Sequence, residues 1–165
     1  MPIQGIEQPN IIQIDDNLRL RKYDGIHNFA LKWYQIKETV MLVDGNDTPY
    51  DEDQLSRMYT YLNNIGELYF IEFLQDGKYF PIGDVTFWKD DMPIVIGDQS
   101  FRGKGIGKKV IKALICRAKE LGYLELYVSE IYRYNKASRK LFESNGFVAC
   151  KETQKGNSFY LKLDK

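Results

Sequence analysis

The stretch FRGKGIGKK, residues 101–109, decides how this sequence is interpreted. It joins a short apolar run that ends near Gly97 to a helical pattern that begins at Ile106. Its three glycines allow a close backbone turn, and the first amides of a helix have no acceptor within that helix. A concave ring of N–H groups at the positive end of a helix suits a phosphate group. The stretch therefore predicts a phosphate-binding loop between a strand and a helix.

The charges around this loop favour an anionic ligand. Seven basic residues and no acidic residue lie between Arg102 and Lys119. Four of them crowd the helix start, namely Arg102, Lys104, Lys108 and Lys109. An exposed cation there costs about 0.3–1 kcal/mol, and a bound polyanion would reverse the sign of that contribution. Solvated lysines on an ordinary helix face explain the same residues.

Two nucleotide-binding fingerprints do not fit the loop. A Walker loop requires G-x-x-x-x-G-K-[ST], but the fifth residue after Gly97 is Arg102, and Lys109 follows Lys108 where Ser or Thr is needed. The dinucleotide fingerprint G-x-G-x-x-G fails because Lys108 stands three residues after Gly105. A nucleotide-phosphate enzyme is therefore the weakest candidate function.

Around the loop, the hydrophobic pattern predicts one mixed α/β domain, residues 1–165, with its core at about 15–163. We expect strands at residues 18–23, 67–74, 79–88, 93–97, 124–129, 147–152 and 158–163. We expect helices at residues 27–36, 51–63, 106–121 and 135–144, with a loop at 42–49. The predicted architecture is a mixed twisted sheet of about six to seven strands flanked by about four helices.

Composition excludes several classes of protein. The chain has 165 residues, 23 Lys+Arg and 23 Asp+Glu, which excludes a generally basic nucleic-acid binder. No apolar run approaches the roughly 18 residues of a membrane span, and the start lacks the pattern of a secretory signal. Two cysteines do not make a disulfide scaffold. We therefore expect a cytoplasmic protein with neither nucleic-acid nor membrane partners.

The single histidine, His27, narrows the chemistry further. One histidine cannot form a His-rich zinc site, and no metal is expected. His27 lies in a helical pattern, and the chain has no G-x-S-x-G motif. A structural contact is therefore expected for His27 rather than a place in a catalytic triad.

Two motifs together resemble a known family. Residues 102–107, RGKGIG, look like the pyrophosphate-binding loop of the GCN5-related N-acetyltransferases (GNAT). Residues 135–147, NKASRKLFESNGF, look like the second motif of that family, N-x-x-[AS]-x-x-[LV]-[YF]-x-x-x-G-F. The expected order of elements also matches the family's fold over most of the chain. The front half, with Trp33 and Tyr34, is most similar to the branch containing ribosomal-protein-alanine and aminoglycoside N-acetyltransferases.

The resemblance implies an enzyme that transfers an acetyl group directly from acetyl-CoA to a primary amine. The loop amides would hold the CoA pyrophosphate, the strand at residues 96–98 would pair with pantetheine, and Asn135 would contact the cofactor arm or cap its helix. The residues that the resemblance assigns to the cofactor are Ile96, Gly97, Asp98, Arg102, Gly103, Lys104, Gly105, Ile106, Gly107, Lys108, Asn135, Arg139 and Phe142.

The resemblance leaves the catalytic groups open. Family members with a base on the central strand place it about eleven residues before the loop's first motif residue, which gives Asp91 here. Asp84 is a second candidate, although Asp91 also fits a turn and Asp84 a surface-facing strand position. Phe142 stands where the family commonly has a tyrosine that protonates the leaving thiolate, so Tyr134, Tyr132 or water would supply that proton, or the thiolate would leave unassisted.

The acceptor amine is also left open. Five acidic residues would suit a cationic amine or simply begin a helix, namely Asp44, Asp47, Asp51, Glu52 and Asp53. The acceptor classes considered are protein amines, aminoglycosides, polyamines and small metabolites, and the chain is expected as a monomer or homodimer. The alternative function, which Phe142 permits, is a non-catalytic acyl-CoA-binding or regulatory module with the same fold.

Overall fold

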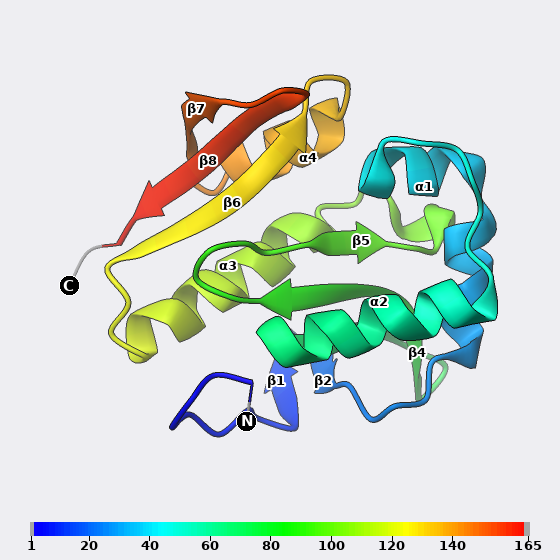
Figure 1. Cartoon of the computed structure of the whole chain (residues 1–165). Helices are drawn as coiled ribbons and strands as arrows, with labels where there is room; N and C mark the ends of the chain where they lie inside the picture. Colours follow the sequence, from blue (N-terminus) through cyan, green and yellow to red (C-terminus); the bar gives the residue numbers. More distant parts are fainter. Residues whose placement is uncertain (1, 164–165) are drawn as a thin grey trace. The chain divides into compact units, whose positions relative to one another are not determined.

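Two separate β-sheets organise the chain in the computed structural model, which describes residues 2–163 (Figure 1). Over these residues the contacts divide into two compact units. Unit 1 comprises the chain up to Thr86 together with Ile94–Arg102, and unit 2 comprises Phe87–Pro93 and the chain from Gly103 onward. The α/β class is confirmed, whereas the expectation of one domain stays a prediction.

Unit 1 is built on a five-stranded sheet with the strand order β1-β2-β3-β4-β5. The strands are β1 (Ile11–Gln13), β2 (Leu18–Lys22), β3 (Glu67–Gln75), β4 (Lys78–Phe87, in unit 1 up to Thr86) and β5 (Ile94–Ile96). Asp76 and Gly77, with φ of 50° and 78°, form the tight turn expected between β3 and β4. β5 is the edge strand of this sheet, so one side of its backbone has no neighbouring strand within the sheet.

The helices of unit 1 differ from expectation, because the helix predicted at 27–36 is a 3₁₀ helix and two further helices were not predicted. The helices of this unit are the 3₁₀ helix η1 (Asn28–Gln35), α1 (Lys37–Asp44), α2 (Glu52–Ile65) and the 3₁₀ helix η2 (Gln99–Phe101). The predicted helix at 27–36 is the 3₁₀ helix, and α1 extends into the predicted loop at 42–49. Ile36 is extended, with φ −81° and ψ 119°, and separates the two; the left-handed Gly45 then ends α1.

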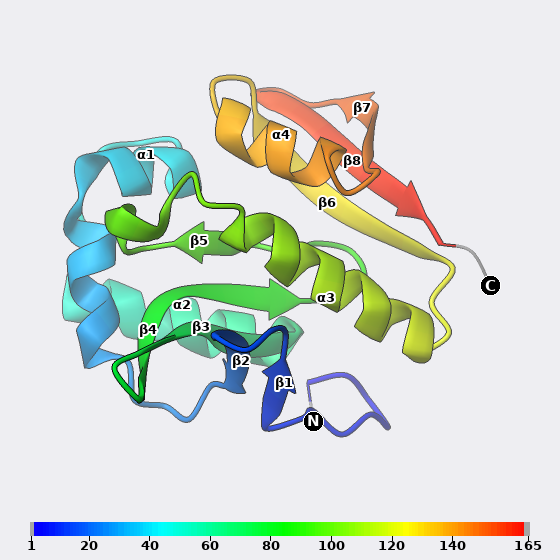
Figure 2. The ribbon, with the colours of Figure 1, turned by 180° about the vertical axis from the view of Figure 1, so that it is seen from behind.

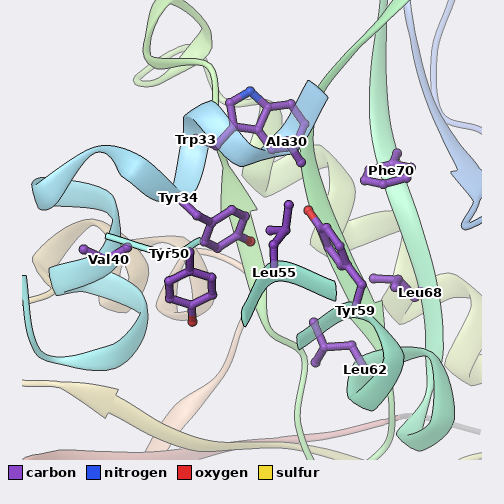
Figure 3. Close-up of a cluster of buried hydrophobic side chains, with 10 residues drawn as sticks. All are labelled: Ala30, Trp33, Tyr34, Val40, Tyr50, Leu55, Tyr59, Leu62, Leu68 and Phe70. Atoms are coloured by element: carbon purple, nitrogen blue, oxygen red, sulfur yellow. The ribbon is translucent and has the colours of Figure 1, made fainter. Parts of the chain in front are cut away.

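Aromatic side chains form the core of unit 1 between η1, α2 and the sheet (Figure 3). α2 lies across one face of the sheet (Figure 1). Tyr59 packs edge-on against Phe70 of β3, with ring centroids 5.6 Å apart. Tyr34 stacks on Tyr50 at 5.1 Å. This packing fixes η1 and α2 on the sheet, because close-packed aromatic cores tolerate little displacement.

Unit 2 carries a three-stranded antiparallel sheet with the order β6-β8-β7. Its elements are α3 (Ile106–Glu120), β6 (Glu125–Tyr132), α4 (Lys136–Glu143), β7 (Val148–Glu152) and β8 (Gly156–Lys162). α4 lies against one face of the sheet (Figure 2). The helix predicted at 106–121 buries one apolar face as α3, and β6 continues three residues beyond the expected end at Ser129 through an irregularity before Ile131. Across residues 2–163, no helix combines the length and apolarity needed to cross a membrane.

Candidate functional site

The glycine loop has the backbone geometry that the sequence predicts. Gly103 and Gly105 have φ of 72° and 78°, which L side chains rarely adopt. Gly105 is the N-cap of α3, and no side chain caps the helix there. The amides of the first turn therefore have neither an intrahelical acceptor nor a capping side chain, and they are available to an anion.

Small and polar side chains hold the start of α3 within unit 2. A Cβ on Gly107 would lie 3.3 Å from the Leu141 side chain, so glycine permits close packing of α3 on α4. Asn145, just after α4, donates from Nδ2 to the Leu141 carbonyl at 3.1 Å and, at 3.5 Å, to the Lys108 carbonyl in the first turn of α3. The two sequence motifs are thus joined in one packed structure.

The side chain of Arg102 is bonded within unit 1. Its Nε donates to the Ile96 carbonyl at 2.8 Å, and its Nη2 donates to Oγ1 of Thr39 at 2.9 Å. Thr39 lies in the first turn of α1 and is 1% exposed. Arg102, which the sequence predicts as a contact of the CoA phosphates, therefore connects β5 to α1.

Among the described residues, the strand that pairs with β5 is β4. Ile96 lies opposite Gly83 and Val95 opposite Asp84. Gly97 follows the strand, and a Cβ there would lie 2.3 Å from ring atoms of Trp33. The absence of a side chain at Gly97 thus allows the Trp33 ring to pack directly against the backbone.

Asp98 ends the predicted cofactor strand. Its Oδ1 accepts from the backbone N–H and hydroxyl of Ser100 at 3.0 and 2.7 Å, which caps η2. Its own N–H donates to the Ile82 carbonyl at 3.0 Å. Asp98 therefore fixes the chain between β5 and the loop.

In the second motif, Asn135 is the N-cap of α4, since its Oδ1 accepts from the Ser138 N–H at 3.1 Å. Arg139 pairs with Glu143 at 3.1 Å. Phe142 is 2% exposed and packs edge-on against Phe147, with ring centroids 5.2 Å apart. The helix-cap interpretation of Asn135 is thus confirmed, and Phe142 is a core residue of unit 2.

Asp84 is a buried carboxylate held by two tyrosines. It is 3% exposed, and its Oδ2 accepts from the hydroxyls of Tyr34 at 2.6 Å and Tyr59 at 2.8 Å. Figure 3 shows the two tyrosines directing their hydroxyls toward one another from η1 and α2. Burial raises the pKa of Asp84 to about 6, while the two hydroxyl donors oppose that rise. The expectation of a surface-facing Asp84 is wrong, because η1 and α2 cover this face of β4.

The two tyrosines remain protonated beside this carboxylate. Burial, followed by the nearby Asp84 charge, raises the pKa of both Tyr34 and Tyr59. Their hydroxyls are therefore donors throughout the physiological pH range. The three groups form one polar cluster inside the aromatic core.

Asp91 lies in the turn after β4, in unit 2. Its Oδ1 accepts from the backbone N–H groups of Met92 and Ser129, each at 3.1 Å. Desolvation raises its pKa, and the Ser129 and Met92 donors lower it. The turn position expected for Asp91 is confirmed, and the carboxylate ties this turn to β6.

Tyr134 precedes α4 in unit 2 and is 48% exposed. Its ring stacks on Tyr132 with centroids 5.4 Å apart. Partial desolvation, and then the neighbouring Tyr132, raises its pKa. The phenol is therefore protonated near neutral pH and reachable from solvent.

His27 makes the structural contacts expected of it. Its Nδ1 lies 2.7 Å from the Tyr23 hydroxyl and its Nε2 lies 3.1 Å from the Ser56 hydroxyl. A small pocket of about 120 Å³ opens beside it, lined in part by Leu31 and Glu52. Among residues 2–163, no group of three or more His, Cys, Asp or Glu side chains is placed to hold a metal ion.

The acidic stretch is largely explained by the start of α2. Asp51 caps the helix by accepting from the Gln54 N–H at 2.8 Å. Asp53 pairs with Arg57 one turn later at 3.3 Å. These contacts favour the helix-start interpretation for this part of the stretch.

Sequence reasoning missed three side chains of this region, namely Tyr34 and Tyr59 as partners of Asp84 and Thr39 as the partner of Arg102. The tyrosines lie 50 and 25 residues from Asp84, and Thr39 lies 63 residues from Arg102. A carboxylate within an apolar run was the one available signal, since a buried charge requires hydrogen-bond donors.

Comparison with protein families gives one match over most of the chain. The Acetyltransferase (GNAT) family matches residues 30–147, which takes in both motifs and parts of both units. None of the curated proteins matches this chain significantly by sequence.

Solved structures with this fold act on different acceptors. An acetyltransferase from Salmonella typhimurium that modifies the N-terminal serine of ribosomal protein L7/L12 matches with a TM-score of 0.71 and 20% identity, covering 93% of this chain and 99% of that one. An aminoglycoside acetyltransferase in complex with coenzyme A matches with a TM-score of 0.70 and 15% identity, covering 88% of this chain and 94% of that one. Spermidine N-acetyltransferase from Vibrio cholerae, in complex with CoA and spermine, matches with a TM-score of 0.71 and 19% identity, covering 90% of this chain and 96% of that one. At these identities the likeness establishes the fold.

Proposed function

Because the chain belongs to the acetyltransferase (GNAT) family and is thereby an acyltransferase, we propose that it transfers an acetyl group from acetyl-CoA directly to a primary amine. The whole chain would act as one N-acetyltransferase domain, since the family match spans both units. The amine nitrogen forms a bond to the acetyl carbon and loses a proton, and the C–S bond breaks to release the CoA thiol.

The observation that carries this proposal is the uncapped start of α3. The amides from Gly103 to Lys108 would hold the CoA pyrophosphate, with left-handed Gly103 and Gly105 shaping the loop. Lys104 and Lys108 would add positive charge. An anion at this place is favoured by both the helix dipole and the local cations.

The remaining cofactor contacts follow from the edge position of β5. The backbone from Ile96 to Asp98, at the end of edge strand β5, would pair with the pantetheine amides alongside its bonds to Arg102 and Ile82. Asn135 has an amide nitrogen besides its capping oxygen, and it would contact the cofactor arm together with Arg139. Phe142, at 2% exposure, would act mainly by packing beneath this region.

We assign the proton-accepting role to Asp84. It lies opposite Val95 of β5, so its backbone is one strand spacing, about 4.8 Å, from β5 and about twice that distance from a pantetheine arm paired on the other side of β5. A carboxylate with a pKa of about 6 is ionised at neutral pH and can still accept a proton. Because Asp84 is buried, the amine proton would reach it through a tyrosine hydroxyl or one water. Asp91 is the second candidate.

Tyr134 is the proposed acid for the leaving thiolate. Phe142 occupies the position of the usual tyrosine, and a buried phenyl ring has no proton to give. Tyr134 is exposed, and its raised pKa keeps the phenol protonated. It would donate that proton to the sulfur as the C–S bond breaks.

A matched pair of glycine variants tests the loop. Gly105→Ala and Gly122→Ala place the same methyl group at φ of 78° and 80° on either side of α3, each with nothing within 4 Å. Both variants therefore carry similar backbone strain. We expect calorimetry to give at least about 10-fold weaker acetyl-CoA binding for Gly105→Ala and unchanged binding for Gly122→Ala. Wild-type protein that binds no acetyl-CoA up to millimolar concentration would contradict the proposal.

Phe142 also favours a second candidate, a non-catalytic acyl-CoA-binding or regulatory module. Thiol release should be measured with acetyl-CoA and a panel of protein N-terminal peptides, lysine peptides, aminoglycosides, polyamines and small metabolic amines. Transfer to any of these amines supports the enzyme. Acetyl-CoA binding without thiol release across the panel supports the module.

A further inference from the structure

The guanidinium of Arg102 joins two elements that are far apart in sequence. It donates to the Ile96 carbonyl of β5 at 2.8 Å and to the Thr39 hydroxyl of α1 at 2.9 Å. Both acceptors belong to unit 1, as does Arg102 itself. A planar guanidinium with two donors committed in this way has a fixed orientation.

The segment that Arg102 holds is attached to β4 and to the end of β5 at two further points. Trp33 of η1 covers Gly97, and the Tyr34 hydroxyl donates to Asp84 of β4. Tyr50, after α1, donates its N–H to the Tyr34 carbonyl at 3.0 Å, so residues 28–50 form one packed segment. Arg102 adds a charged contact at the α1 end of that segment.

Release of Arg102 toward a phosphate would be costly. Thr39 is 1% exposed, so its hydroxyl would lose the Arg102 donor without gaining free access to water. Buried polar groups that lose a partner bear their full desolvation penalty. Loop amides and lysines are present to bind a phosphate, whereas the Thr39 hydroxyl receives its Arg102 hydrogen bond from inside unit 1.

We propose that Arg102 is a positioning residue that fixes the segment 28–50 to β5, and that it affects the reaction through the amine side rather than through the phosphates of CoA. This inference rests on the proposed function, because it assumes that β5 holds the acyl donor. The segment includes Asp44 and Asp47 and leads directly to the start of α2, so its placement relative to β5 sets where an amine meets the acetyl group.

The first test uses isosteric variants of Thr39. Thr39→Val removes the hydroxyl and retains the side-chain shape, whereas Thr39→Ser retains the hydroxyl. We expect Thr39→Val to raise the KM for the amine about 10-fold, with an unchanged Kd for acetyl-CoA by calorimetry. Thr39→Ser should restore the wild-type KM. A general loss of folding would instead lower kcat and donor binding together.

The second test separates a phosphate contact from a positioning contact. Arg102→Met is assayed with acetyl-CoA and with acetyl-pantetheine, which has the same thioester but lacks the pyrophosphate. A positioning role predicts the same fold-loss in kcat/KM with both donors. It also predicts that the Arg102→Met/Thr39→Val double variant is no worse than Arg102→Met, because Thr39→Val removes a contact that Arg102→Met has already removed.

Two results would overturn the proposal, and a third would instead show that the proposed function on which it rests is wrong. If the loss of kcat/KM in Arg102→Met disappears with acetyl-pantetheine, Arg102 is a phosphate-binding residue. If Thr39→Val has the wild-type KM for the amine, the Arg102–Thr39 hydrogen bond does not affect the acceptor. If wild-type protein binds acetyl-CoA but transfers to no amine, the proposed function fails first. Non-additive effects of Arg102→Met and Thr39→Val on the thermal unfolding temperature would then show that the Arg102–Thr39 contact has a structural role alone.

Discussion

Asp84 and Asp91 are two carboxylates seven positions apart whose pKa values are both raised by burial. They differ in the groups that hold them. Asp84 accepts two tyrosine hydroxyls at its Oδ2, from elements distant in sequence. Asp91 is held mainly by backbone N–H groups at its Oδ1, from Met92 and Ser129, and a hydrogen bond from the Ser129 side chain adds to them.

This difference separates a reactive carboxylate from a structural one. Backbone N–H groups do not exchange roles with a substrate proton, and an amide oxygen can accept from them in the same geometry, although more weakly than a carboxylate oxygen does. A tyrosine hydroxyl both donates and accepts, so it can pass a proton to the carboxylate that it contacts. The surroundings of Asp84 are therefore suited to proton transfer, and those of Asp91 to joining a turn to a strand.

The largest expected effect is the loss of activity in Asp84→Asn. An amide cannot take the proton of the attacking amine, so kcat should fall about 10²–10⁴-fold, the usual contribution of general base catalysis. Thiol release across pH measures this loss. In wild-type protein the rate should rise as the pH passes through about 6, where Asp84 ionises, and this limb should be absent from the variant.

Calorimetry supplies the control for Asp84→Asn. The variant should bind acetyl-CoA as tightly as wild type, because the proposed cofactor contacts come from β5, the glycine loop and the residues Asn135 and Arg139, and none of them involves Asp84. A variant that retains the full rate and the limb near pH 6 would remove Asp84 from the reaction.

The second expected effect is a pH-dependent change in stability. Folding raises the pKa of Asp84 from 3.8 to about 6, so between these values the folded chain binds a proton that the unfolded chain releases. Stability from this group therefore falls as pH rises through that window, by about 3 kcal/mol in total. Urea unfolding of wild type and Asp84→Asn at about pH 4 and 7 measures the difference between the two proteins. Parallel changes with pH would contradict the raised pKa.

Local sequence signals correctly predicted the glycine loop and the helix that follows it. Gly103 and Gly105 have the left-handed φ that the motif implied, and Asn135 is the helix cap that its position indicated. Such features depend on residues within a few positions of one another. Backbone conformation, capping and hydrophobic periodicity determine them locally.

The surroundings of Asp84 and Arg102 were not predictable in this way. A period-two pattern indicates which residues share a face of a strand, but not whether a distant helix covers that face. Tyr34, Tyr59 and Thr39 reach their partners across 25 to 63 residues of intervening sequence. The expectation of a surface-facing Asp84 was wrong for this reason.

The third expected effect concerns the tyrosines that hold Asp84. Tyr59→Phe removes a donor to a charged acceptor and should lower the free energy of unfolding by about 1.5–3 kcal/mol at neutral pH. It should also raise the pKa of Asp84, because the hydroxyl favours the ionised carboxylate, and so move the acidic limb of activity to higher pH. Tyr61→Phe, 62% exposed on the same helix, is the matched control. Equal effects in the two variants would show that the hydroxyl does not act on Asp84.

The smallest expected effect is that of Asp91→Asn. The amide Oδ1 can accept the same two N–H groups from Met92 and Ser129, so the turn keeps its connection to β6. A neutral acceptor is weaker than a charged one, and we expect a loss of less than about 1 kcal/mol in urea unfolding. The pH profile of thiol release should be unchanged. If Asp91→Asn instead removes the acidic limb while Asp84→Asn retains it, the roles of the two carboxylates are reversed, because the backbone-held group would then be the one that accepts the amine proton.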